Sequence, residues 1–172
     1  MSLNLYFLSN SLFLITIQQN WKCKSTKDRK KRLYSKIQEY LKRKQAVSRP
    51  LAITFTKVNQ IVRGWINYFR IGSMKKFIDE FGQWLRHKIR CIIIKQWKKP
   101  MTIYRNLRIL NIKYKSKFSE EEIYKCANTR LGWYRRSGMD VVNFILSPKV
   151  LNIGKGDRPG LVHPLNYYLK SL

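Results

Sequence analysis

Acidic residues are scarce in this chain of 172 residues, which holds 9 Asp and Glu against 36 Lys and Arg. Polymerases and nucleases that act through two metal ions need carboxylates that converge on one point. Here Asp79 and Glu80 are neighbours in a helical pattern, residues 120–122 open a helix, and Asp140 and Asp157 stand in separate loop contexts. We therefore expect no catalytic residues, no metal site and no cofactor, and we do not expect the chain to be an enzyme on its own.

Cysteine and histidine are rare as well. Cys23, Cys91 and Cys126 lie far apart, and His87 and His163 form no closely spaced pair with them. Structural zinc sites and disulfide frameworks need several such residues at short, recurring spacings. Neither is expected here, and we predict reduced thiols in a cytoplasmic protein, with Cys91 facing a core.

Phosphate-binding loops, nucleophile elbows and export signals are missing. The string GKGDRPG at 154–160 follows no strand pattern and leads into no helix with a following Ser or Thr, so we interpret it as a loop. The apolar segment at 1–17 has no basic start and is interrupted by polar residues, unlike a signal peptide, and it is short for a membrane span. We expect no membrane partner, and we interpret this segment as a β-hairpin or a buried segment that needs a neighbour.

Positive charge is what the chain has in abundance. The formal net charge is +27, and 44% of the residues are hydrophobic. This apolar fraction indicates a folded domain rather than a disordered basic tail. Because so much charge repels itself in a compact monomer, contact with a polyanion is favourable, and released counterions drive the binding. Nucleic acid is the expected partner, with a ribosomal-type RNA-binding protein and a membrane-surface protein as alternatives.

Apolar residues recur at helical spacing through most of the chain. A dense basic block at 22–44 predicts an amphipathic helix that Ser25 or Thr26 caps, and Pro50 closes the region. The apolar positions of this helix are Leu33, Ile37, Tyr40 and Leu41. The next helix contains VRGWINYFR at 62–70, and its apolar stripe consists of Val58, Ile61, Val62, Trp65, Ile66 and Phe69.

A second long helix is predicted at 73–98, where Gly72 supplies a stop for the preceding helix, Ser73 a cap, and Pro100 the end. A shorter helix at 102–110 should turn its arginines outward. The side chains that we expect the long helix to expose are Lys75, Lys76, Arg86, Arg90 and Lys95.

The capping box of Ser119 and Glu122 predicts the start of a further helix. The tail from Ser147 onward is rich in proline and glycine and is interpreted as a loop until LNYYLKSL at 165–172. No convincing strand alternation follows residue 55. The predicted fold is all-α, a small basic helical bundle with a loop-rich C-terminal tail and a short apolar N-terminal segment.

One polar face of the helix around VRGWINYFR presents Gln60, Arg63, Asn67 and Arg70 at three- and four-residue steps. These side chains are donors for phosphates, sugars and base edges. Gly64 in the same helix costs about 1 kcal/mol relative to alanine. A close approach to the backbone by a packed helix or a nucleic-acid strand would explain it.

The stretch from 58 to 110 resembles the maturase-specific region, or domain X, of group II intron reverse transcriptases. The family pattern reads L-R-G-W-x-N-Y-F, then W-[IL]-R-R-[RK]-[IL]-R, then W-K-x-P and R-N-L. His87 stands where the family commonly has arginine. The matching positions are Arg63, Gly64, Trp65, Asn67, Tyr68, Phe69, Trp84, Leu85, Arg86, Lys88, Ile89, Arg90, Trp97, Lys98, Pro100, Arg105, Asn106 and Leu107.

This resemblance implies a domain organisation. Residues 1–24 are unmatched, 25–50 resemble the basic linker helix after the polymerase palm, and 51–112 form the maturase-specific domain. Residues 113–172, with GWYRRS and GLVHPLNYYLKSL, resemble the C-terminal extension of the family. The fingers and palm, including the YADD-type turn, and an HNH endonuclease are not recognisable, so we interpret the chain as a truncated or frameshifted remnant or as one part of a split protein.

The resemblance also implies a function. Domain X is the thumb of the polymerase, a helical bundle that helps to grip the template-primer and binds the intron RNA, whose active fold it stabilises for splicing. The RNA itself performs the transesterifications. The implied partner is group II intron RNA, and a DNA target or a separate reverse transcriptase polypeptide are further candidates.

For the site, we expect Arg63, Asn67 and Arg70 from one helix and Arg86, Arg90 and Lys95 from the next to form an RNA-facing groove. Tyr68 and Tyr134 are candidates for stacking on bases, and core or boundary positions are the alternative, which we favour for Tyr68. Further RNA-binding candidates are Lys98, Arg105, Arg135 and Arg136. The motif core consists of Gly64, Trp65, Tyr68, Phe69, Trp84 and Trp97.

Two functions of different classes follow. The chain is an RNA-binding splicing cofactor, acting in cis on its host intron or in trans. Alternatively, it is a non-autonomous thumb subunit or a pseudogene remnant that folds only with a separate reverse transcriptase polypeptide, which the apolar N-terminal segment favours. DNA binding as the main activity is a third and less favoured function.

Overall fold

The computed structural model describes residues 27–154 and 159–172. Within these ranges the structure has ten α-helices and no strand, which confirms the all-α class. The apolar segment 1–24, the proposed caps Ser25 and Thr26, and most of the string at 154–160 lie outside the described residues. The helices are α2 (Lys27–Tyr40), α3 (Arg43–Ser48), α4 (Leu51–Phe69), α5 (Lys75–Trp97), α6 (Pro100–Lys113), α7 (Glu120–Asn128), α8 (Trp133–Ser137), α9 (Asp140–Ile145), α10 (Pro148–Asn152) and α11 (Pro164–Ser171).

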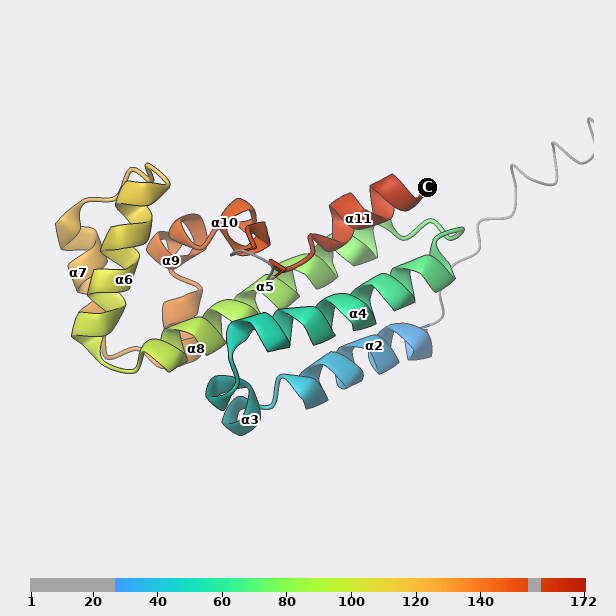
Figure 1. The fold of residues 1–172 in the computed structure, drawn as a ribbon, viewed down its shortest axis with the longest axis horizontal. Helices are drawn as coiled ribbons and strands as arrows, with labels where there is room; N and C mark the ends of the chain where they lie inside the picture. The colour runs from blue at the N-terminus through green and yellow to red at the C-terminus, as the bar shows by residue number, and fades with distance from the viewer. Residues whose placement is uncertain (1–26, 155–158) are drawn as a thin grey trace, which may run out of the picture.

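Three long helices, α2, α4 and α5, run side by side and form one end of the molecule (Figure 1). The ring of Tyr34 in α2 packs edge-on against the α5 rings of Phe81 and Trp84, at centroid distances of 5.3 and 4.7 Å. Trp65 in α4 meets Phe77 in α5 at 5.4 Å. These aromatic contacts join the three helices around one core.

The apolar stripe predicted for α4 is confirmed. Val58, Val62 and Ile66 are buried, and Ile61, Trp65 and Phe69 are partly buried against the same core. The apolar positions of α2 behave in the same way, since Leu33 and Ile37 are buried while the adjacent Arg32 and Lys36 are exposed. The helical spacing of apolar residues therefore predicted correctly which side of α2 and of α4 is buried in the core.

The start of α5 differs from the prediction. Its first residue is Lys75 and its N-cap is Met74, which makes no side-chain cap, so the expected cap at Ser73 is wrong. Tyr168 of α11 takes over this role, because its hydroxyl accepts from the backbone N–H of Met74 at 3.4 Å and donates to the carbonyl of Gly72 at 2.6 Å. The turn between α4 and α5 is thus stabilised from a residue almost 100 positions away.

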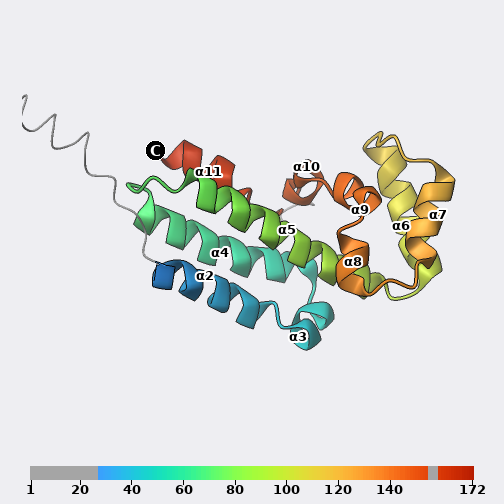
Figure 2. The ribbon, with the colours of Figure 1, turned by 180° about the vertical axis from the view of Figure 1, so that it is seen from behind.

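At the other end of the molecule, α6 and α7 pack together beyond the end of α5 (Figure 2). The predicted capping box is present: Ser119 Oγ accepts from the N–H of Glu122 at 3.3 Å, and the N–H of Ser119 donates to Glu122 Oε2 at 2.8 Å. Pro100, expected only to end α5, is also the first residue of α6, where proline suits a helix start.

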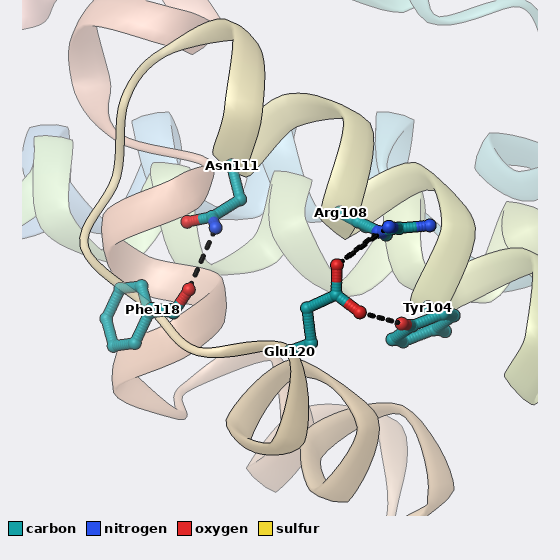
Figure 3. A network of polar contacts seen from close by, with 5 residues as sticks. All are labelled: Tyr104, Arg108, Asn111, Phe118 and Glu120. Atoms are coloured by element: carbon teal, nitrogen blue, oxygen red, sulfur yellow. Dashed lines mark hydrogen bonds and ion pairs between the residues drawn. The ribbon is translucent and has the colours of Figure 1, made fainter.

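A polar network fixes α7 against α6 (Figure 3). Glu120 accepts from Arg108, with 2.7 Å between Nη2 and Oε1, and from the hydroxyl of Tyr104 at 3.2 Å. Asn111 Nδ2 donates to the carbonyl of Phe118 at 2.9 Å. Arg108 is exposed as predicted, but its charge is already paired within the protein.

The C-terminal region is more ordered than the expected loop-rich tail. Ser147 accepts from the N–H of Val150 and begins the short helix α10, where Pro148 occupies the first turn. The loop interpretation of residues 148–152 is therefore wrong, because the Ser-Pro pair that suggested a break is here a helix start.

Asn59 of α4 holds this C-terminal region in place. The side chain is buried, and its amide donates to the carbonyl of Gly160 at 2.8 Å and accepts from the N–H of Val162 at 2.8 Å. A Cβ on Gly160 would lie 2.1 Å from the carbonyl oxygen of Asn152, so only glycine fits there without a shift of the backbone. The segment before α11 is thus attached directly to α4.

No helix in the described part of the chain combines the length and the apolar character that a membrane span requires.

Candidate nucleic-acid interface

The outer face of α4 carries a row of exposed side chains. Gln60, Arg63, Gly64, Asn67 and Tyr68 follow one another at alternating three- and one-residue steps and are all exposed. The opposite side of the same helix is buried in the core. The amphipathic pattern of α4 therefore determines that this polar row faces away from the core.

Helix α2 places three cations beside this row. Arg29, Arg32 and Lys36 stand on one face of α2, at three- and four-residue steps, and are exposed. Between them and α4 lies a groove of ≈ 570 Å³, which we call the α2–α4 groove. No carboxylate of the described residues lines it. Its lining residues are Arg29, Arg32, Leu33, Lys36, Gln60, Ile61, Gly64, Trp65, Tyr68 and Phe69.

Aromatic rings contact two cations of α2, Arg29 and Lys30. The guanidinium of Arg29 lies 5.4 Å from the centroid of the Phe69 ring, and the ammonium of Lys30 lies 4.7 Å from that of Phe77. A cation over an aromatic face is attracted to it but keeps its full charge. The rings thus orient the side chains without neutralising them.

Carboxylates neutralise very little of the charge. Among residues 27–154 and 159–172, the one salt bridge is Arg108–Glu120. The other exposed cations in these ranges have no carboxylate within bonding distance, so their potential is available to an external polyanion.

The far side of the α4 row meets α11. The guanidinium of Arg63 lies 5.5 Å from the centroid of the Tyr167 ring, and the Tyr167 hydroxyl donates to Asn67 Oδ1 at 3.1 Å. The structure therefore brings Arg63 and Asn67 together with a tyrosine that the sequence interpretation did not include. Arg70, at the end of α4, is exposed nearby.

Arg90 does not lie on the surface, and the expectation that α5 exposes it is wrong. Its side chain is 8% exposed. Nε donates to the carbonyl of Leu146 at 3.0 Å, and Nη1 and Nη2 donate to the side chain and carbonyl of Asn143 at 2.7 and 3.2 Å. Burial, with a smaller effect of the neighbouring Arg86, lowers the pKa of Arg90 to about 10, so the group stays charged at neutral pH. The reason for the error is that α9 and the residues after it cover this side of α5.

Two other predicted arginines are also partly or wholly covered. Arg86 is half-buried, and its Nη1 is buried without a hydrogen-bond partner among the described residues. Arg136 is 7% exposed, donates to the carbonyl of Thr129, and lies 5.1 Å from the centroid of the Trp133 ring. The expected groove between α4 and α5 is therefore not formed by these arginines, and the cations beside α4 come from α2.

The remaining predicted cations are spread over the other end of the molecule. Lys98, Arg105 and Arg135 are exposed, on or next to α5, α6 and α8. Lys95 is partly buried and lines a smaller cavity of ≈ 190 Å³ together with Trp133. None of these four lines the α2–α4 groove.

The aromatic motif residues divide into two groups. Trp65, Phe69, Trp84 and Trp97 are partly buried and pack against the core, as expected. Tyr68 is 72% exposed, so its expected place in the core is wrong and the stacking alternative fits its position. The spacing of α4 explains this, because Tyr68 falls on the polar row and not on the apolar stripe. Tyr134 is also exposed.

A second polar cluster joins α5 to α8. Cys91 is partly buried, with its Sγ 2.7 Å from Ser137 Oγ, which in turn lies 3.4 Å from His87 Nε2. Burial, and to a lesser degree the charges of Arg90 and Lys88, lower the pKa of His87. No group of three or more metal-binding side chains occurs in the described ranges.

Stability should fall as the pH is lowered. Burial also lowers the pKa of His163, whose Nδ1 accepts from the N–H of Asn166 at the start of α11. Because histidines in the unfolded state have a pKa of about 6.5, the unfolded state takes up protons first as the pH falls, and the folded state loses stability. We expect a lower melting temperature at about pH 5.5 than at about pH 7.5.

The double variant His87→Asn/His163→Asn should show a smaller difference in melting temperature between these two pH values. Asparagine at position 163 can still cap the helix. If the melting temperature of the double variant fell by as much as that of the wild-type chain, the histidines would be excluded as the cause of the pH dependence.

Sequence reasoning missed Arg29, Arg32 and Lys36 as individual site residues, although it identified their helix as basic. Their three- and four-residue spacing is visible in the sequence. What the spacing does not reveal is which side of α2 faces α4, because the basic residues of α2 surround most of the helix.

Comparison with protein families gives a match. Residues 30–110 match the family model described as "Group II intron, maturase-specific domain". This range runs from α2 through most of α6 and contains every residue that lines the α2–α4 groove except Arg29. No reverse transcriptase catalytic domain is found, and no curated protein matches the chain.

Proposed function

Because residues 30–110 of the chain are a group II intron maturase-specific domain, we propose that the protein binds group II intron RNA and stabilises its catalytically active fold, which promotes splicing. The observation that carries the proposal is that the matched segment presents exposed cations beside a polar and aromatic helix face. In this proposal the RNA performs the transesterifications, and the protein contributes binding.

The physical basis of the binding is electrostatic. Each arginine or lysine that contacts a phosphate releases condensed counterions, which gives affinity that falls with salt. Arginine adds bidentate contacts with phosphate and stacking on bases. Structured RNA also displays 2′-hydroxyls and unstacked bases, which suit amide and aromatic side chains such as Asn67 and Tyr68.

Stabilisation of the active RNA fold then follows from linkage. A protein that binds the folded RNA more tightly than the unfolded RNA shifts the folding equilibrium by its differential affinity. The face formed by α2, α4 and α11 would supply this difference, because aromatic rings orient two of its cations, Arg29 and Arg63. A flexible basic chain would bind both forms of the RNA alike.

Equilibrium binding tests the proposal. The purified chain is titrated against a folded group II intron RNA and against a scrambled RNA of the same length and base composition, at about 150 mM salt so that non-specific attraction is partly screened. We expect at least tenfold tighter binding of the intron RNA. Equal affinities would contradict the proposal, because charge alone would then account for binding.

A further inference from the structure

Gly64 occupies an unexplained position in the middle of α4. Glycine is, after proline, the least favourable residue in a helix interior. A Cβ on Gly64 would meet no atom within 4 Å among the described residues, whereas a Cβ on Gly160 or Gly82 would approach neighbouring groups of the protein closely. Packing within the described part of the protein therefore does not require glycine at position 64, and the open space above it is part of the α2–α4 groove.

The walls of the groove differ in chemistry. The α2 side is cationic, with Arg32 and Lys36 on successive turns. The α4 side includes Gly64, the amide of Gln60 and the ring of Tyr68, together with the partly buried apolar side chains of Ile61, Trp65 and Phe69. The ring of Tyr68 is held by an edge contact with Phe69 at 4.7 Å, yet 72% of the residue is exposed, so most of its surface is available to a ligand.

This combination favours one kind of occupant. Three cations and no carboxylate favour an anionic ligand, and an exposed aromatic ring beside bare backbone favours a flat group that can stack. The volume of ≈ 570 Å³ lies within the range of small-ligand pockets. The bases of a duplex are stacked on one another and are not available to such a groove, whereas those of single strands and bulges are.

We infer that the α2–α4 groove binds an unpaired nucleotide of RNA, with its base against Gly64 and Tyr68 and its phosphate at Arg32 and Lys36. Gln60 can donate to or accept from the edge of the base. The inference rests on the proposed function only in taking RNA as the ligand. It adds that this groove distinguishes single-stranded nucleotides from duplex. It also explains the glycine at position 64, because a side chain there would occupy the position of the base.

Two variants test the groove. Leucine in Gly64→Leu is a good helix former that would fill the groove, and Tyr68→Ala removes the stacking ring. Binding is measured with a 12-nucleotide oligouridylate and with a 12-base-pair RNA duplex at about 150 mM salt. We expect each variant to bind the oligouridylate about tenfold more weakly, as the loss of one stacked base predicts, and to bind the duplex within twofold of the wild-type affinity.

The controls separate this effect from damage to the fold. Tyr68→Phe keeps the ring and should retain the affinity for the single strand, as should Tyr124→Ala, which removes an exposed tyrosine on α7. Gly64→Leu should melt at the wild-type temperature or above it, because leucine favours the helix.

Unchanged oligouridylate binding in both Gly64→Leu and Tyr68→Ala would overturn the inference and would fit a groove that binds a protein segment instead. An equal loss for single strand and duplex would also overturn it. The preference of the wild-type chain for folded intron RNA is measured separately. The proposed function can therefore fail while the groove still distinguishes single strands from duplex. Equally, the chain can prefer intron RNA while the groove makes no such distinction.

Discussion

Replacing Arg90 by methionine is expected to lower the free energy of unfolding by about 3 kcal/mol. The guanidinium makes three hydrogen bonds, to the carbonyl of Leu146 and to the side chain and carbonyl of Asn143, and it is almost fully buried. Hydrogen bonds to a charged group contribute more than neutral ones, and the substitution leaves acceptors behind in a covered site. Methionine keeps much of the side-chain volume of arginine, so the decrease in the free energy of unfolding results mainly from the lost polar contacts.

Urea-induced unfolding followed by far-ultraviolet circular dichroism measures this change. Arg105→Met is the matched control, because Arg105 is an exposed arginine on α6 and its replacement should change stability by no more than about 0.5 kcal/mol. Equal effects of the two substitutions would mean that Arg90 does not attach the region around α9 to α5.

Removing three cations from the face of α2 and α4 should weaken binding to folded intron RNA about 100-fold at about 150 mM salt, if this face contacts the RNA as proposed. The variant is Arg32→Gln/Lys36→Gln/Arg63→Gln, which changes exposed residues of α2 and α4. Each lost phosphate contact reduces the magnitude of the slope of the log binding constant against log salt concentration by slightly less than one. The magnitude of the slope should therefore decrease by about 2 to 3. Titrations at four salt concentrations between about 100 and 300 mM measure both quantities.

The matched control removes the same charge elsewhere. The triple variant Lys113→Gln/Lys117→Gln/Lys125→Gln alters exposed lysines around α6 and α7, at the other end of the molecule (Figure 1). It should retain the wild-type affinity within about threefold, since those lysines lie on neither α2 nor α4. Equal losses in the two variants would show that net charge alone, and not the face of α2 and α4, determines binding.

Local sequence patterns were sufficient for part of this structure. The stripe of Val58, Val62 and Ile66 and the capping box at Ser119 were predicted correctly, because each depends on residues within a few positions of one another. The exposed row of α4 follows from the same periodicity. A core or boundary position was favoured for Tyr68 over stacking on a base, although its spacing places it on the polar row.

Long-range packing could not be predicted in this way. Arg90 has a charged side chain on a helix, which usually indicates an exposed position. Its burial depends on α9, more than 50 residues later, and on acceptors in a region that was interpreted partly as loop. The role of Tyr168 as a partner of the turn before α5 has the same origin. The cations of α2 were visible in the sequence, but their position across the groove from Gly64 depends on how α2 packs against α4.

The most direct test is the rate of splicing of a group II intron RNA at a magnesium concentration so low that the RNA alone splices slowly. If the protein stabilises the active fold of the RNA, added protein should increase the rate in a saturable manner, and the variant Arg32→Gln/Lys36→Gln/Arg63→Gln should require a much higher concentration for the same effect. A rate that stays unchanged at protein concentrations that saturate binding to the RNA would contradict the proposed function.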